Sequence, residues 1–177
     1  HSALIFIDGF QVEGVTRLFQ DSVFMIPHLG ILSTVHPKAA LEIFEKDCLV
    51  MLGTCIAFSG KLTENDYGKK VGEVTIKMPN GEVLERDVEY GTIQRIKLNE
   101  GEVAEVEIRP SSPFRVSAQT GVGRKFTTNV DGGVVGILID ARGRPIDLPQ
   151  GDELRRKKLR EWFSALEAYP IETLDKL

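Results

Sequence analysis

Residues 70–90, KVGEVTIKMPNGEVLERDVEY, carry the clearest structural signal in this chain. Two strand-like segments, Lys70 to Met78 and Val83 to Tyr90, flank the tripeptide Pro79-Asn80-Gly81. Asn-Gly readily adopts the positive φ angles of a tight turn, and such a turn matches the twist of the strands that it joins. The stretch therefore predicts a β-hairpin within a β-rich fold.

The β pattern extends on both sides of this hairpin, from residue 49 to about residue 150. The other strand candidates are Leu49 to Phe58, Thr92 to Leu98, Val103 to Arg109, Phe114 to Val116, Arg124 to Val130 and Val134 to Ile139. Asn99-Glu100-Gly101 is expected to turn the segment 92–98 back along 103–109, where apolar residues alternate with glutamates. Short strands separated by turn residues favour an antiparallel barrel or a sandwich.

The first 48 residues contain both strand-like and helix-like segments. Ala3 to Ile7 and Val23 to Ile26 are predicted strands, whereas Val12 to Phe19 fits neither a strand nor a helix well. Leu29 to Val35 is expected to form one turn of helix. Pro37 opens a clearer helix through Lys46, because a proline at the first helical position loses no hydrogen bond.

A final helix is expected from about Asp152 to Glu167, with acidic residues at its positive end. Its apolar stripe consists of Leu154, Leu159, Trp162, Phe163 and Leu166. The predicted fold class is thus α+β, mainly β: an antiparallel β-barrel or sandwich, preceded by a short α/β segment and closed by a C-terminal helix. We expect 1–48 to pack on a barrel-like domain at 49–150, followed by the helix at 151–168 and a tail at 169–177.

Composition restricts the classes of function. A chain of 177 residues that is 42% hydrophobic supplies one ordinary core, and a net charge of −4 does not suggest nucleic acid. No segment resembles a signal peptide or a membrane span, so the expected location is the cytoplasm. The start at His1-Ser2 resembles the end of a domain excised from a longer protein.

Cysteines and histidines give no metal or redox signal. Cys48 and Cys55 lie in apolar surroundings at a spacing that matches no zinc or redox motif, so both are expected to be buried. The three histidines are scattered and lie outside the β region, so we expect neither a metal site nor a catalytic triad. We therefore assign no catalytic residue.

The turn after the last predicted strand, in DGGVVGILIDARGRPIDLP (131–149), holds the first candidate site. Asp140, Arg142 and Arg144 could bind a polyanion or a partner, because guanidinium groups pair bidentately with phosphate or carboxylate. The alternative is a hairpin turn stabilised by the Asp140 side chain, with Gly143 in a left-handed conformation and Ile146 to Leu148 returning beside the strand.

Two further groups are candidates for anion or partner binding. Arg124 and Lys125 follow the glycines Gly121 and Gly123, although the absence of a following helix argues against a dinucleotide loop. Arg155 and Arg156 open a basic run on the final helix, which is otherwise expected to be a solvated face.

Four blocks of sequence, in order, resemble the C-terminal region of bacterial proteins of the glutamate mutase L (MutL) family, which are distinct from mismatch-repair MutL. The blocks are IDGFQVEGVTRLFQD (7–21), HPKAALEIFEKDCLVMLGTCIAFSG (36–60), VEYGTIQRIKLNEGEVAEVEIRPSSPF (88–114) and DGGVVGILIDARGRPIDLP (131–149). The resemblance implies an N-terminal part similar to actin-like ATPases and an accessory role toward cobalamin-dependent mutases.

The resemblance implies ATP only for a part of the parent protein outside this chain. Asp8-Gly9 lacks the flanking glycines and threonines of a phosphate loop, so no cofactor is expected here. The leading hypothesis is a non-catalytic binding or structural module that contacts mutase subunits or the parent ATPase domain, or forms a homo-oligomer. The alternatives are a domain that binds a small-molecule anion, catalytically or not, and a carrier-type domain, for which the turn at 79–81 lacks a central lysine.

Overall fold

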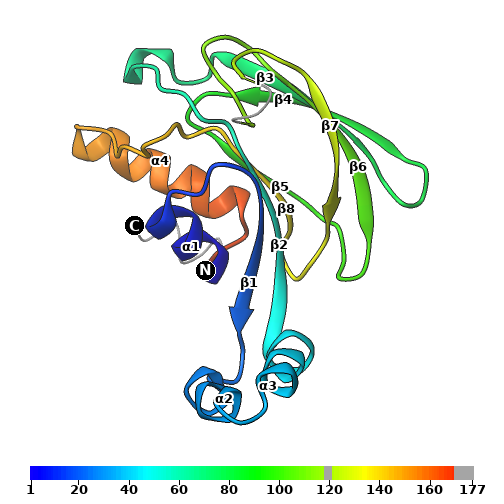
Figure 1. Cartoon of the computed structure of the whole chain (residues 1–177). Coiled ribbons are helices and arrows are strands. Elements are labelled where there is room, and N and C mark those ends of the chain that lie inside the picture. The colour runs from blue at the N-terminus through cyan, green and yellow to red at the C-terminus, as the bar shows by residue number, and fades with distance from the viewer. Residues whose placement is uncertain (118–120, 170–177) are drawn as a thin grey trace.

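The computed structural model describes residues 1–117 and 121–169, which form two four-stranded β-sheets and four α-helices (Figure 1). The helices are α1 (Ser2–Phe10), α2 (Ile26–Ser33), α3 (Pro37–Ile43) and α4 (Asp152–Ala165), with a π-helical turn at Phe44–Cys48 and a 3-10 turn at Glu64–Asp66. The strands are β1 (Gly14–Asp21), β2 (Leu49–Ala57), β3 (Lys70–Lys77), β4 (Val83–Glu89), β5 (Ile93–Ile96), β6 (Val103–Pro110), β7 (Phe126–Asp131) and β8 (Gly136–Asp140).

Sheet 1 has the order β1-β2-β8-β5. β1 and β5 run antiparallel to their neighbours, whereas β8 lies parallel to β2, with Gly53 opposite Gly136. A side chain at residue 53 would not fit, since a Cβ there would lie 2.0 Å from the carbonyl oxygen of Gly136. β1 pairs with β2 along its length, so the expected limit between 1–48 and 49–150 falls inside one sheet.

Sheet 2 has the order β4-β3-β6-β7 and is antiparallel throughout. The predicted hairpin at 70–90 is confirmed as β3 and β4, with Gly81 at a φ of 87° in the turn. The two sheets pack face to face as a sandwich, and they do not close into a barrel. The core between them includes Ile56, Ile137 and Ile139 from sheet 1 and Val74, Ile76, Val106 and Ile108 from sheet 2.

Helices α1 and α4 cover the other face of sheet 1, as Figure 1 shows. Ile7 of α1 and Trp162 of α4 pack there against Cys55 and Leu138. Because sheet 1 is covered on both faces, every residue of β8 is buried, which explains the apolar run of Ile137, Leu138 and Ile139 before Asp140. The predicted C-terminal helix is confirmed as α4, although Lys158 in its basic run is buried, with its ammonium 4.9 Å from the ring centroid of Tyr67.

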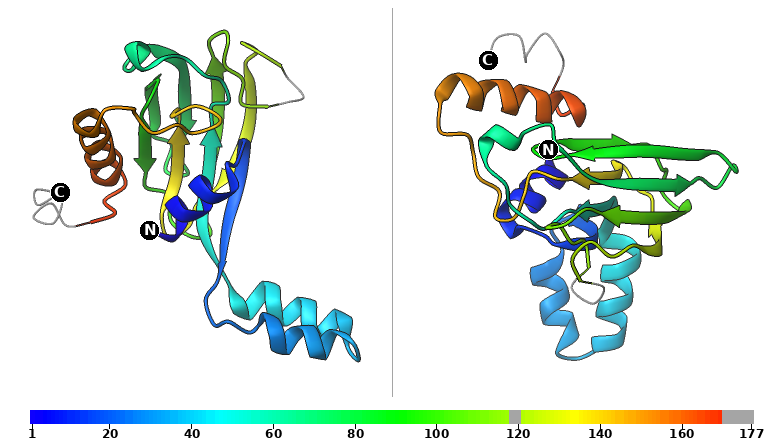
Figure 2. Two further views of the ribbon diagram at one scale, coloured as in Figure 1. Left: turned by 90° about the vertical axis from the view of Figure 1, so that its left-hand side faces the viewer. Right: turned by 90° about the horizontal axis from the view of Figure 1, so that it is seen from above.

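Helices α2 and α3 form a helical hairpin that connects β1 to β2. This hairpin stands away from both sheets at the ends of these strands (Figure 2). The predicted helix at 37–46 is confirmed as α3, which continues into the π-helical turn, and the predicted turn of helix at 29–35 falls largely in α2, which ends at Ser33. The ambiguous segment 12–19 is largely strand, in β1.

Two predicted strands near the N-terminus are wrong. Ala3 to Ile7 lies in α1, because a short apolar run does not distinguish a buried strand from a helix that buries one side. Val23 to Ile26 turns into α2 instead: the Asp21 carboxylate accepts hydrogen bonds from the backbone N–H groups of Val23 and Phe24, at 3.1 and 2.9 Å.

Three expectations in the β region also fail. Segments 92–98 and 103–109 do not pair, because β5 joins sheet 1 and β6 joins sheet 2. Phe114 to Val116 makes only an isolated bridge between Ser59 and Arg115. Ile146 to Leu148 does not return beside β8, because β2 and β5 already occupy both edges of that strand. Of the predicted tail, residues 170–177 lie outside the described residues.

Candidate functional site

The first candidate site lies where β8 ends, beneath α1 and α4. The Asp140 side chain is completely buried, and its Oδ1 accepts a hydrogen bond from the backbone N–H of Arg142 at 3.0 Å. Gly143 follows with a φ of 96°. The predicted turn, stabilised by Asp140 and a left-handed Gly143, is thus confirmed, while the predicted returning strand is absent from this part of the described chain.

Arg142 is buried, and its Nε and Nη2 atoms both donate hydrogen bonds. Its Nε donates to Asp140 Oδ1 at 3.1 Å, and its Nη2 donates to Asp140 Oδ2 at 2.9 Å and to Asp8 Oδ1 at 2.6 Å. The guanidinium also lies 5.1 Å from the ring centroid of Trp162, whose indole N–H donates to the carbonyl of Gly91 at 2.8 Å. Arg142 therefore ties the end of β8 to α1 and α4.

Arg144 makes a second set of contacts to the same carboxylate. Its Nη2 donates to Asp140 Oδ2 at 3.1 Å, its Nε to the carbonyl of Val12 at 2.7 Å, and its Nη1 to the carbonyl of Gly143 at 2.7 Å. Nearby, the Gln11 side chain accepts a hydrogen bond from the backbone N–H of Ile146 at 2.7 Å. These bonds attach the segment between α1 and β1 to the turn after β8.

We call Asp8, Asp140, Arg142 and Arg144 the charged cluster. Burial by itself would raise the pKa of Asp140, but the two guanidinium groups outweigh it and lower that pKa below its ordinary value. Burial likewise opposes the charge of Arg142, yet Asp140 and Asp8 raise its pKa. The formal charges of two carboxylates and two guanidiniums cancel, so the charged cluster presents little net charge to an external anion.

Cys55 lies next to the charged cluster but is not a candidate nucleophile. Its side chain is fully buried, and burial, with the nearby Asp140, raises the pKa of its thiol. A thiol in that state is not ionised near neutral pH and is not accessible. Cys48 is buried as well, so the expectation for both cysteines is confirmed.

Arg124 and Lys125 are exposed on the loop that leads into β7. Lys125 forms an ion pair with Glu107 at 3.1 Å. The backbone N–H groups of Gly121 and Gly123 donate to the carbonyls of Ser117 and Phe114, at 3.2 and 3.0 Å, so neither points at an anion. The loop has the glycines of an anion-binding turn without free donors at those two positions.

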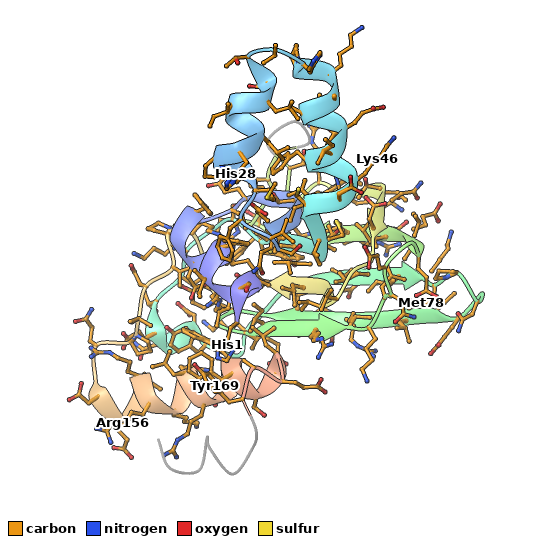
Figure 3. All side chains as sticks on the ribbon, turned by 90° about the horizontal axis from the view of Figure 1, so that it is seen from below. His1, His28, Lys46, Met78, Arg156 and Tyr169 are labelled. Carbon is orange, nitrogen blue, oxygen red and sulfur yellow. The ribbon has the colours of Figure 1, made fainter. Side chains whose placement is uncertain are left out.

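Arg155 and Arg156 lie on α4, on the other side of the molecule from β7 (Figure 1). Arg155 donates to the carbonyls of Pro149 and Gln150, at 3.0 and 3.3 Å, and pairs with Asp152. Arg156 is exposed and lies on the side of α4 that faces away from the sheets (Figure 3). The seven predicted residues therefore divide into one buried group and two separate surface pairs.

A different surface, which the sequence reasoning missed, lies on the helical hairpin. Its exposed large apolar side chains form what we call the hairpin surface: Val23, Phe24, Met25, Ile26, Ile31, Val35 and Leu41. Phe24 and Ile31 are 80% and 72% exposed. A signal for it existed, because residues 22–37, SVFMIPHLGILSTVHP, contain no Asp, Glu, Lys or Arg.

The two helices of the hairpin enclose an apolar groove of about 370 Å³. It is lined by Ile26, Leu29, Gly30, Ser33, Pro37, Ala40, Leu41 and Phe44. Charged side chains on the hairpin are confined to α3 and the π-helical turn, where Glu42 and Lys46 pair at 3.6 Å. The hairpin surface is thus apolar, open and nearly free of charge.

The outer face of sheet 2 offers no comparable site. Its hollow of about 400 Å³ is lined by Thr75, Lys77, Glu85, Glu105, Glu107, Arg109 and Thr127. Lys77 pairs with Glu105, and Arg109 with Glu107, so the charges largely satisfy one another. Such exposed pairs are typical of a solvated sheet face.

Over residues 1–117 and 121–169, no three His, Cys, Asp or Glu side chains lie close enough together to hold a metal ion. None of the helices described is both long and apolar enough to cross a membrane. Comparisons with protein-family models, with curated proteins and with solved structures found no match to this chain.

Proposed function

We propose that this chain is a non-catalytic protein-interaction module and that it binds protein through the hairpin surface. The observation that supports this function is the exposure of the seven large apolar side chains that make up the hairpin surface. Water-exposed apolar area on that scale is unfavourable unless a partner covers it. The hairpin is also the part of the chain that stands clear of the sandwich, so a partner can reach it from several sides (Figure 2).

The size of the hairpin surface supports a protein partner. With roughly 150–200 Å² for a large apolar side chain, the exposed fractions correspond to on the order of 700 Å². Soluble monomers seldom expose a contiguous apolar patch larger than roughly 300–600 Å². A small ligand in the groove would leave Phe24, Ile31 and Val35 uncovered, because none of them lines it.

The charged cluster supports a structural role and not the anion-binding alternative. All the hydrogen bonds described for Arg142 and Arg144 go to Asp8, Asp140 and backbone carbonyls. An anion would have to displace a buried carboxylate to reach them. The structure gives no support to the carrier-type alternative, which needs a free lysine at the tip of a hairpin. Lys77, the lysine nearest the β3–β4 turn in sequence, pairs with Glu105.

The wider setting that we propose is that of an accessory protein of the MutL type, located in the cytoplasm and linked to a cobalamin-dependent mutase. In this setting the ATPase belongs to another part of the parent protein, and this module attaches that part to mutase subunits or to its own oligomer. The proposal rests on the resemblance of the four sequence blocks and on an interaction surface that suits such attachment.

Site-specific photo-crosslinking tests the interaction. A photoreactive amino acid replaces Ile31 in the full-length protein in its native host, and the matched control carries it at Ile5, an isoleucine of α1 that is 66% exposed. We expect abundant protein adducts from residue 31 and few from residue 5. Equal, low yields at the two positions would contradict the proposal, and adducts that contain mutase peptides would support the wider setting.

A further inference from the structure

We infer that the partner of the hairpin surface is the same surface on a second copy of this chain, so that two helical hairpins form a four-helix bundle around a twofold axis. This inference rests on the proposed function and names the partner. The hairpin extends from the ends of β1 and β2, beyond the sandwich (Figures 1 and 2). Two hairpins can therefore pack side by side while their sandwiches point in opposite directions.

The composition of α2 favours burial on more than one side. Its sequence, IPHLGILS, contains no Asp, Glu, Lys or Arg. Only Leu29 is buried within the chain, whereas Ile26 and Ile31 are 55% and 72% exposed. A helix that is apolar around its whole circumference is typical of the interior of a bundle. One neighbour, α3, covers one side of α2, and a second hairpin would cover the rest.

The groove between α2 and α3 provides the matching concave part. Three residues on its walls, Gly30, Ser33 and Ala40, are small, which lets another helix approach closely. Large side chains such as Phe24 and Ile31 lie outside the groove and project from the same hairpin. One hairpin thus presents both projections and a hollow, as a self-complementary twofold interface requires.

The charges of the hairpin also suit an antiparallel self-pair. Lys38 lies at the start of α3, Glu45 and Asp47 lie at its far end, and the intervening Glu42 pairs with Lys46. When two copies of α3 run antiparallel about a twofold axis, the basic end of each faces the acidic end of the other. The self-pair therefore gains opposite-charge contacts at both ends.

The area is sufficient for a stable dimer. The hairpin surface exposes on the order of 700 Å² of apolar side chain, and a standard specific interface buries roughly 800 Å² on each partner. The interface would be apolar at its centre and charged at its ends, as protein interfaces commonly are. The exposed apolar area is therefore of the order that each partner of a stable dimer buries.

Sedimentation velocity of this 177-residue chain tests the inference at roughly 1–200 μM, a range set by moderate dimer affinities. We expect a mass of twice 19.7 kDa at high concentration for the unaltered chain and for Ile5→Glu. We expect Ile31→Glu to be monomeric, with a dissociation constant at least tenfold higher. A monomer at every concentration, or a dimer that Ile31→Glu leaves intact, would overturn the second copy as partner.

A charge-reversal pair tests the twofold geometry. Lys38→Glu and Glu45→Lys each place like charges at the ends of the bundle, so each variant should self-associate several-fold more weakly than the unaltered chain. Mixed together, they should form a heterodimer that is tighter than either homodimer. A mixture with no preference for the heterodimer would contradict the antiparallel arrangement of α3.

The experiments can contradict the proposed function and the second copy as partner independently of each other. A chain that is monomeric in sedimentation but whose residue 31 crosslinks to another protein loses the second copy as partner and keeps the proposed function. A monomeric chain without adducts at residue 31 loses both. Melting curves of Ile31→Glu and Ile5→Glu, recorded at a concentration low enough to keep the chain monomeric, serve as folding controls, because substitutions at two exposed positions should leave the unfolding midpoint of the monomer nearly unchanged.

Discussion

The charged cluster and the hairpin surface reverse the usual association of charge with the outside and apolar residues with the inside. Asp140 and Arg142 are 0% and 3% exposed, whereas Phe24 and Ile31 are 80% and 72% exposed. The charged cluster is paired within the chain, since Arg142 donates to two carboxylates and Arg144 donates to one carboxylate and two backbone carbonyls. The apolar side chains of the hairpin surface, in contrast, are exposed to solvent in the single chain. Our proposal therefore identifies a binding surface by its exposed apolar area and not by its polarity.

The largest expected effect comes from opening the charged cluster. Asp140→Ala leaves two buried guanidiniums with only Asp8 as carboxylate partner, and breaking a buried pair from one side costs about 3–5 kcal/mol. Urea denaturation should show the loss in the free energy of unfolding. The control is Asp152→Ala, whose carboxylate is 87% exposed. A loss for Asp140→Ala as small as that of the control would mean that the charged cluster does not hold the fold.

Low pH should also weaken the charged cluster, because it protonates the Asp140 carboxylate. The pKa of folded Asp140 lies below that of an unfolded aspartate, so the folded chain binds fewer protons and is less stable as the pH falls. The contribution of Asp140 to the free energy of unfolding is complete above the pKa of an unfolded aspartate, about 4. It is lost as the pH falls through the lower pKa of folded Asp140.

Trp162 is the sole tryptophan and lies over Arg142, so its fluorescence follows the charged cluster directly. Its emission should shift on acid unfolding below pH ~4. Asp66, whose pKa Lys69 and Thr63 lower to about 2, also contributes to the acid response. Asp66→Asn therefore serves as the comparison. An acid transition of the same size in Asp140→Ala and in the unaltered chain would contradict the assignment to Asp140.

A smaller effect is expected at the edge of the charged cluster. Trp162→Phe keeps an aromatic ring near Arg142 but removes the indole N–H that donates to the Gly91 carbonyl. Loss of this bond and some packing should cost about 1–3 kcal/mol. Thermal unfolding followed by circular dichroism measures it, with the partly exposed Phe163→Leu as the neighbouring control. No change beyond that of Phe163→Leu would show that the indole N–H contributes little.

Local sequence signals predicted much of the fold. The Asn-Gly turn indicated β3 and β4, and Pro37 and the acidic Asp152 indicated the starts of α3 and α4. The parallel pairing of β2 with β8 was not predictable in this way, because partners such as Gly53 and Gly136 are far apart in sequence. No local pattern encodes which edges of a strand are already occupied.

Three of the four residues of the charged cluster were predicted, whereas Asp8 and the burial of the cluster were not. The charged residues of the turn after β8 were identified correctly as a group, since they lie within five residues of one another. Their burial depends on α1 and α4, and the bond from Arg142 to Asp8 spans 134 positions of sequence. Because Ala3 to Ile7 was expected to be a strand, the helix that supplies Asp8 was not expected above the turn. The uncharged stretch 22–37 was the signal for the hairpin surface.

The smallest expected effect on stability is at the hairpin surface itself. Ile31→Glu should change the free energy of unfolding by no more than about 0.5 kcal/mol, because its side chain already lies in water. Leu29→Ala on the same helix removes a buried side chain and should cost about 2 kcal/mol or more. Urea denaturation at a concentration low enough to keep the chain monomeric measures both.

The pair of substitutions separates the fold of the hairpin from its binding. If Ile31→Glu destabilises the dilute monomer as much as Leu29→Ala does, the hairpin surface belongs to the core of the single chain, and the contrast with the charged cluster disappears. Ile31→Glu could instead leave the stability of the dilute monomer unchanged and lower the unfolding midpoint only at high concentration. The substitution would then have removed stability that comes from association with a partner. Linkage requires this concentration dependence, since a partner stabilises only the folded state that it binds.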